Sequence, residues 1–142
     1  MTKRYRLLIA DRNPRIRNFL RREFATAGYV VRLAENGEQL LKILYARVPV
    51  DLLIIDPDFP DTDYAVLIAT LREHEPQLPV VLHTLDPDMN SQRLHLSLMQ
   101  WVEKNGCSVE NLKKTVAGLL DVRQRALHDA GVEREGNPIP GS

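Results

Sequence analysis

Residues 51–56 read Asp51-Leu52-Leu53-Ile54-Ile55-Asp56, an unbroken apolar run between two acids. A short run of this kind is typical of a strand that is buried on both faces, and such strands belong mainly to parallel sheets. Asp56 would then lie at the carboxyl end of that strand, close to the core. Because a carboxylate in that position is costly unless something pairs with it, we expect Asp56 to meet a cation or a ligand.

Comparable apolar runs recur along the chain, and stretches with helical spacing separate them. This alternation predicts an α/β, doubly wound, mostly parallel sheet with helices on both faces. The segment 85–97 leaves room only for a short, irregular helix. The five predicted strands are 5–10, 29–33, 52–55, 80–83 and 98–102, and the helical stripes are 16–24, 40–44, 66–71 and 109–120, the last continuing weakly to Leu127.

Helix start signals agree with this arrangement. Asn13 followed by Pro14 predicts a capped helix with proline in its first turn, and Asn36-Gly37 predicts the start of the second helix. Asp63 and Ser108 are suitable caps for the two later helices.

Length and composition limit the class of protein. The 142 residues fit one domain, which we expect to occupy 1–127, followed by a disordered tail at 128–142 that has no hydrophobic period. Nineteen basic and nineteen acidic residues balance, so neither nucleic acid nor a membrane is an expected direct partner. No apolar run reaches spanning length, and Cys107 is the single cysteine. We therefore expect a soluble, cytoplasmic protein.

Polar residues follow four of the predicted strands. Asp11, Asp56, Thr84 and Lys104 lie at or just after the ends of the first, third, fourth and fifth strands. In doubly wound sheets the ligand site lies beyond these carboxyl ends, so we expect the four side chains to share one site. A small enzyme or nucleotide-binding protein is less favoured, because no glycine-rich phosphate loop follows the first strand.

Taken together, these motifs resemble the receiver domain of bacterial two-component response regulators, over roughly Arg4 to Leu120. Leu7 to Pro14 looks like the family's first strand and acidic turn, and Asp56-x-x-x-Pro60-x-x-Asp63 is similar to its phosphoacceptor loop. Thr84 matches the switch hydroxyl, and Trp101-Val102-Glu103-Lys104 matches the fifth strand with its lysine. The resemblance implies a flavodoxin-like three-layer sandwich with strand order 2-1-3-4-5.

The resemblance also implies a chemistry. Asp56 would accept a phosphoryl group from a histidine kinase or phosphotransfer protein, and Lys104 and Thr84 would contact the phosphoryl oxygens. Mg²⁺ would be held by the carboxylates of Asp11 and Asp56 and by the backbone carbonyl of Asp58. The domain would be a signalling module, with self-phosphorylation and self-dephosphorylation as its only reactions.

Thr84 and Trp101 match the family's switch residues. Their rearrangement is expected to change the surface formed by the helix within 85–97, the strand 98–102 and the final helix. That surface would bind a downstream protein effector, and it could also support a homodimer.

Arg12 departs from the family, which usually has a second acid at this position. The missing acid is a direct magnesium ligand, so metal binding is expected to be weakened or lost. Arg12 could instead fold over Asp11, Asp56 or Asp58 as an internal cation. The alternative function is therefore a degenerate pseudo-receiver that binds partner proteins without phosphorylation.

Overall fold

The computed structural model describes residues 4–85, 99–106 and 108–136, with 128–136 described as backbone only. They form a five-stranded parallel sheet in the order β2-β1-β3-β4-β5. The α/β doubly wound fold and the strand order are thus confirmed. The strands are β1 (Arg6–Ala10), β2 (Val30–Ala34), β3 (Leu52–Ile55), β4 (Val80–Thr84) and β5 (Met99–Glu103).

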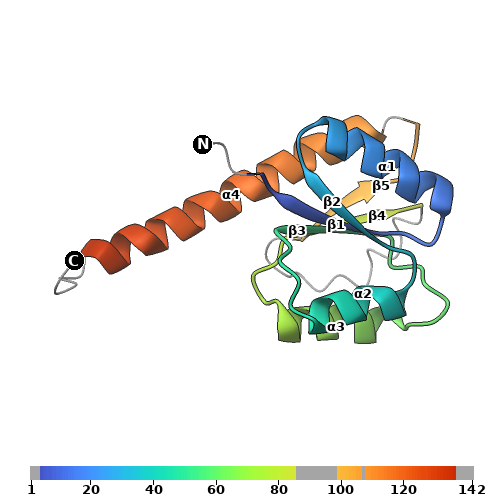
Figure 1. Ribbon diagram of the computed structural model, residues 1–142, viewed down its shortest axis with the longest axis horizontal. Helices are drawn as coiled ribbons and strands as arrows, with labels where there is room; N and C mark the ends of the chain where they lie inside the picture. The colour runs from blue at the N-terminus through green and yellow to red at the C-terminus, as the bar shows by residue number, and fades with distance from the viewer. Residues whose placement is uncertain (1–3, 86–98, 107, 137–142) are drawn as a thin grey trace.

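Helices cover both faces of the sheet (Figure 1). One face carries α1 (Pro14–Thr26) and α4 (Ser108–Gly136), and the other carries α2 (Gly37–Tyr45) and α3 (Tyr64–His74). Each face has its own apolar cluster, in which Leu52 and Ile54 pack toward α1 and α4, and Leu53 and Ile55 toward α2 and α3. The apolar run of β3 is unbroken because both of its faces are covered.

Three predicted caps begin helices as expected. Asn13 Oδ1 accepts from the Arg15 backbone N–H at 2.9 Å, and Asn36 Oδ1 accepts from the Gln39 N–H at 2.8 Å. Asp63 Oδ2 accepts from the Val66 N–H at 3.4 Å. These bonds satisfy N–H groups that have no partner within the helix.

The last helix begins at Ser108 and continues to Gly136, past the predicted end at Leu127, and projects beyond the sheet (Figure 1). The expectation of an irregular tail from residue 128 is therefore wrong for 128–136. Good helix formers and an Asp121–Arg125 pair at 3.1 Å favour its continuation, and Gly131, the glycine inside the segment 128–136, costs only about 1 kcal/mol. The rest of the predicted tail, 137–142, and the expected short helix within 85–97 lie outside the described residues, apart from Leu85.

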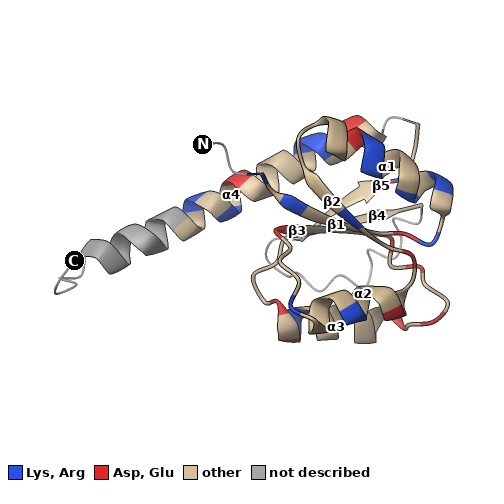
Figure 2. Cartoon of the chain, in the orientation of Figure 1, with Lys and Arg blue, Asp and Glu red and all other residues tan. Residues whose placement is uncertain are grey.

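Charged residues are spread over the helices and loops that surround the sheet (Figure 2). Figure 2 shows several basic positions along α1, whereas the loops at the carboxyl ends of the strands carry acids. No described helix is long and apolar enough to cross a membrane.

Candidate functional site

Asp11 and Asp56 lie side by side at the carboxyl end of the sheet because the backbone pairing of β1 continues past the strands. The Asp56 N–H donates to the Ala10 carbonyl at 2.9 Å, and the Asp11 N–H donates to the Ala34 carbonyl at 3.1 Å. Asp11 is 2% exposed and Asp56 8%. Two buried acids next to each other need a cation.

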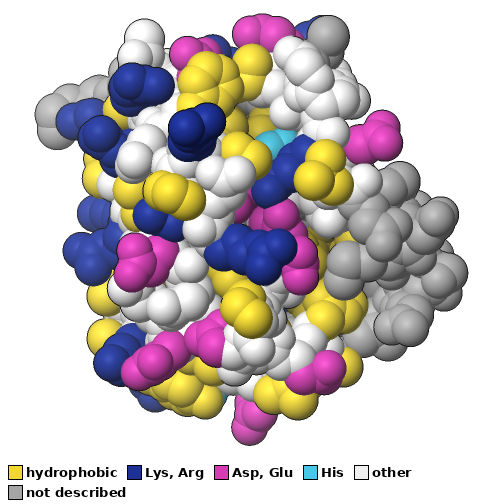
Figure 3. Space-filling view, turned by 90° about the vertical axis from the view of Figure 1, so that its right-hand side faces the viewer, with side chains coloured by type: hydrophobic (Ala, Val, Ile, Leu, Met, Phe, Trp, Pro, Cys, Tyr) yellow, Lys and Arg dark blue, Asp and Glu magenta, His cyan; other side chains and the backbone are white. Residues whose placement is uncertain are grey.

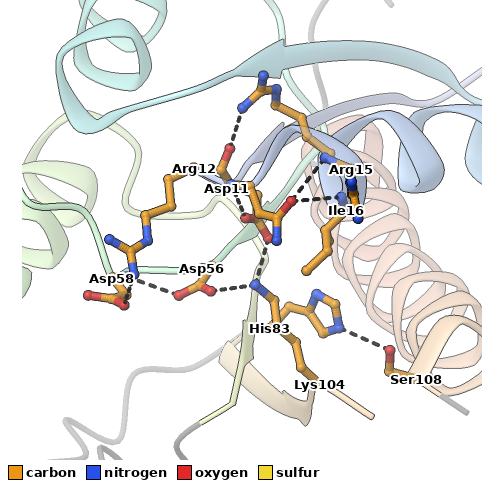
Figure 4. Close-up of polar contacts among 11 residues, drawn as sticks. Asp11, Arg12, Arg15, Ile16, Asp56, Asp58, His83, Lys104 and Ser108 are labelled. Atoms are coloured by element: carbon orange, nitrogen blue, oxygen red, sulfur yellow. Dashed lines mark hydrogen bonds and ion pairs between the residues drawn. The ribbon is translucent and has the colours of Figure 1, made fainter. Parts of the chain in front are cut away.

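Lys104 supplies that cation (Figure 4). Its Nζ lies 2.8 Å from Asp11 Oδ2 and 2.5 Å from Asp56 Oδ2. Burial alone would lower the pKa of Lys104, but its hydrogen bonds to Asp11 and Asp56 and their charges outweigh burial and raise it. The Lys104 backbone N–H donates to the Thr84 carbonyl at 2.8 Å, which fixes the end of β5 beside the end of β4.

Backbone donors hold the remaining oxygens of the two acids. Asp11 Oδ1 accepts from the Asn13 N–H at 2.8 Å, and Asp56 Oδ1 accepts from the Asp58 N–H at 3.0 Å. In both bonds the donor lies two residues after the acid, so each carboxylate stabilises the turn of the loop in which it lies. The carboxylates are therefore oriented before any ligand arrives.

Arg12 lies at the mouth of the site. Its Nη2 is 3.2 Å from Asp58 Oδ2, and the two side chains are 55% and 64% exposed. Figure 3 views this end of the molecule, where acidic and basic side chains meet near the centre. An ion pair this exposed contributes little stability, so Arg12 can change partners at low cost.

The residues fit a tightly held magnesium ion poorly. Among the described residues, no three His, Cys, Asp or Glu side chains form a group able to hold a metal. Asp11 and Asp56 both direct an oxygen at Lys104, and the neighbouring position that would carry a further acid is Arg12. The predicted magnesium set, Asp11, Asp56 and the Asp58 carbonyl, stays a prediction.

The two predicted switch residues lie on neighbouring strands. Thr84 is buried at the end of β4, and Trp101 is half-buried in β5, where it pairs in register with Leu82. Trp101 packs against the apolar cluster on the α2 and α3 face. The structure thus places Asp11, Asp56, Thr84 and Lys104 together at the carboxyl ends of the strands. Their roles stay predictions.

Comparison with known proteins identifies the family of the chain. The sequence profile of the response regulator receiver domain matches residues 7–117. The chain belongs to this family. Among curated relatives of this receiver domain, the regulatory protein AtoC of Escherichia coli K12 is 33% identical over 84 residues, and the DNA-binding transcriptional regulator NtrC of the same strain is 31% identical over 83. These alignments cover 59% and 58% of the chain and 18% of each relative, so the chain spans less than a fifth of the length of those proteins.

Solved structures agree with this assignment. The response regulator TrrA of Thermotoga maritima, crystallised with Mg²⁺-BeF, is 28% identical to this receiver domain with a TM-score of 0.73, covering 81% of this chain and 98% of that one. A CheY-like receiver domain protein of Methanospirillum hungatei JF-1 has a TM-score of 0.78 at 17% identity, covering 87% and 99%, which shows a shared fold.

Sequence reasoning missed a buried polar contact beside the receiver site. His83, 3% exposed, precedes Thr84, and its Nε2 lies 3.2 Å from the Ser108 hydroxyl at the start of α4. Burial and the charge of Lys104 lower the pKa of His83 to about 4, although Asp56 acts in the opposite direction. The apolar run around His83 predicts its burial, but no local pattern predicts a partner 25 residues away.

A second missed residue fixes the loop after Asp56. Asp61 accepts from the backbone N–H groups of Gly37 at 3.1 Å and Glu38 at 3.0 Å, which lowers its pKa, mainly through the Glu38 bond. A Cβ added at Gly37 would lie 2.1 Å from the Thr62 hydroxyl oxygen. The loop therefore packs closely on the start of α2, and this contact restrains the segment that follows the acceptor.

Proposed function

We propose that this receiver domain accepts a phosphoryl group on Asp56 from a histidine kinase or phosphotransfer protein. The observation that carries the proposal is the contact of the buried Asp56 carboxylate with Lys104 at 2.5 Å. This contact lies at the carboxyl ends of the strands, where β4 ends in Thr84. The related response regulator TrrA was crystallised in complex with Mg²⁺-BeF, which supports a ligand-binding role for this family of domains.

In the transfer step, a carboxylate oxygen of Asp56 attacks the phosphorus of a phosphohistidine. The new O–P bond forms as the P–N bond breaks, and the histidine nitrogen leaves with the bonding electron pair. Lys104 offsets negative charge on the transferring group, and Thr84 donates its hydroxyl to a phosphoryl oxygen. The oriented carboxylate provides the alignment that this reaction needs.

The aspartyl phosphate then changes the charge at the carboxyl ends of the strands. It carries about 1.5 to 2 negative charges where the carboxylate carried one, so it adds up to about one negative charge, which favours a second conformation of the residues around Thr84 and Trp101. The surface that would respond includes β5, the start of α4 and the segment before β5, and it would bind a downstream protein effector or a second copy of the chain. We propose a cytoplasmic signalling module with no catalytic turnover of other substrates.

The experiment is incubation with acetyl phosphate or phosphoramidate in the presence of Mg²⁺, followed by intact mass measurement. Wild type should gain the mass of one phosphoryl group, and Asp56→Asn should gain none. Thr84→Ala should still be labelled, because it retains the acceptor. Unlabelled wild type with both donors would refute the proposal.

A second candidate function is the degenerate pseudo-receiver. The observation that favours it is the cationic surrounding of the two acids, with Lys104 between them and Arg12 on Asp58. In that case a partner protein would bind wild type and Asp56→Asn with equal affinity, and no phosphoryl donor would change this affinity. A donor-dependent difference between the two proteins would exclude it.

A further inference from the structure

We propose that Arg12 supplies the positive charge that faces the phosphoryl group on Asp56, in place of a divalent ion. This inference rests on the proposed function and specifies how its site works. It makes Arg12 a phosphoryl-binding residue and the transfer reaction independent of Mg²⁺.

The geometry places Arg12 directly over the acceptor loop (Figure 4). Arg12 follows Asp11 in the chain, and its Nη2 contacts Asp58 Oδ2 at 3.2 Å. Asp58 is in turn tied to the acceptor, because its backbone N–H donates to Asp56 Oδ1 at 3.0 Å. The Arg12–Asp58 pair therefore joins the loop after β1 to the loop after β3, beside the carboxylate that would carry the phosphoryl group.

The negative charges around a phosphorylated Asp56 would exceed the positive charge that Lys104 provides, so a second cation such as Arg12 would stabilise the site. Lys104 already contacts Asp11 and Asp56, so its single charge is shared between two carboxylates. A phosphoryl group on Asp56 would add negative charge that Lys104 alone does not offset. Arg12 is the next residue in the chain after Asp11, and it brings a second cation to the acceptor loop.

A change of partner by Arg12 is energetically reasonable. The Arg12 and Asp58 side chains are both more than half exposed, so the pair between them is weak and screened by solvent. A phosphoryl group offers several charged oxygens, and a guanidinium can bind two of them with parallel hydrogen bonds. Phosphorylation of Asp56 would thus draw Arg12 from Asp58 to the stronger acceptor.

The same residue disfavours a divalent ion. A cation at position 12 repels Mg²⁺ from the neighbouring carboxylates, and it replaces a side chain that could have been a ligand. Substituting an acid at position 12 should therefore reverse both effects, creating a metal site and removing the guanidinium.

The test compares wild type, Arg12→Gln, Arg12→Asp and Arg15→Asp. Arg15 is an exposed residue in the first turn of α1, so Arg15→Asp makes the same change of charge outside the site. Phosphorylation by phosphoramidate is followed by intact mass in Mg²⁺ and in EDTA, and Mg²⁺ binding is measured separately by titration calorimetry. Circular dichroism checks that each variant is folded.

Wild type and Arg15→Asp should be labelled at equal rates in Mg²⁺ and EDTA. Arg12→Gln should be about tenfold slower in both, the loss expected for one charged hydrogen bond. Arg12→Asp should be slow in EDTA and recover in Mg²⁺, and among the four proteins it alone should give a heat of Mg²⁺ binding.

Two results would overturn the inference while leaving phosphorylation of Asp56 intact: wild type labelled only in Mg²⁺, or Arg12→Gln labelled as fast as wild type. A different result, with no label on any of the four proteins, would refute the proposed function itself. The calorimetry would still decide whether Arg12 excludes metal, because equal Mg²⁺ binding by wild type and Arg12→Asp would refute that part.

Discussion

Lys104 joins the ends of three strands, because its ammonium contacts the acids that follow β1 and β3 and its backbone N–H contacts the end of β4. Its removal would leave two buried carboxylates without a cation. We predict that Lys104→Met lowers the free energy of unfolding by about 3 kcal/mol at neutral pH, as measured by urea denaturation. Adding Asp56→Asn should restore a large part of the loss, because a single buried acid remains. If the double variant is as unstable as Lys104→Met, repulsion between the acids is not the cause.

His83 gives the molecule a defined sensitivity to acid. Its pKa falls from 6.5 in the unfolded chain to about 4 in the native protein, so the unfolded chain binds the proton more readily. The stability contributed by neutral His83 is thus complete above pH 6.5 and is lost as the pH falls toward 4. The loss amounts to about 3 kcal/mol, because one pKa unit corresponds to about 1.4 kcal/mol.

The comparison variant for this pH effect is His83→Gln, which keeps a polar group near Ser108 but has no imidazole. Between pH 7 and pH 4, chemical denaturation should show a larger loss of stability for wild type than for the variant, by roughly this 3 kcal/mol. Parallel pH profiles for the two proteins would show that His83 does not titrate in this range.

At the residue scale, the sequence allowed prediction of those site positions that follow strand ends. Asp56 and Asp11 were expected at the same end of the sheet because parallel strands end together. For Arg12 the sequence left Asp11, Asp56 and Asp58 open as partners, and the structure pairs it with Asp58. The contact of His83 with Ser108 depends on the packing of α4 against β4. No local pattern specifies such a contact, so it required the structure.

At the scale of elements, the start of α2 must approach the loop after Asp56 closely. A Cβ at Gly37 would lie 2.7 Å from the Thr62 Cβ, whereas a Cβ at Gly118 in α4 would meet nothing within 4 Å. We predict that Gly37→Ala lowers the free energy of unfolding by about 1 to 3 kcal/mol, whereas Gly118→Ala raises it by up to about 1 kcal/mol. Thermal and urea unfolding of both variants measure this difference. Equal effects of the two substitutions would mean that the loop shifts freely away from α2.

The elements themselves were predictable because hydrophobic periodicity and caps are local signals. Strand bounds differ by one residue in several cases, such as the predicted 29–33 against Val30–Ala34, since periodicity does not define the last hydrogen-bonded residue. The bonds from Asp61 to the start of α2 were not predicted, because they join residues more than twenty positions apart. The helix beyond Leu127 was missed because it lacks an apolar stripe, which was the signal used to predict helices.

For the whole molecule, α4 continues beyond the part that packs against the sheet (Figure 1), and we expect this extension to be separable from the domain. The described contacts of α4 side chains with the rest of the domain come from residues 108–124, as with Lys113 to Glu23 and Arg123 to Asp51. A helical segment without packing adds little stability. We therefore predict that residues 1–127 alone unfold within about 1 kcal/mol of the full chain and are phosphorylated equally. A much less stable truncated protein would show that the extension belongs to the folded domain.

The order of the strands could not be derived from periodicity, which identifies strands but not their neighbours. It came instead from the resemblance of the motifs to a family, and the observed sheet confirms it. The same resemblance suggested a magnesium site that the residues around Arg12 fit poorly. Family likeness therefore predicted the arrangement of the chain, whereas the magnesium chemistry beside Arg12 stays a prediction.

The central claim is that Asp56 carries the phosphoryl group. The most direct measurement is to treat the protein with phosphoramidate, reduce the acyl phosphate with borohydride and identify the modified residue by peptide mass spectrometry. Reduction should convert the residue at position 56 to homoserine in wild type and leave the Asp56→Asn variant unchanged. Homoserine at position 11 or 58 instead, or at no position, would contradict the account.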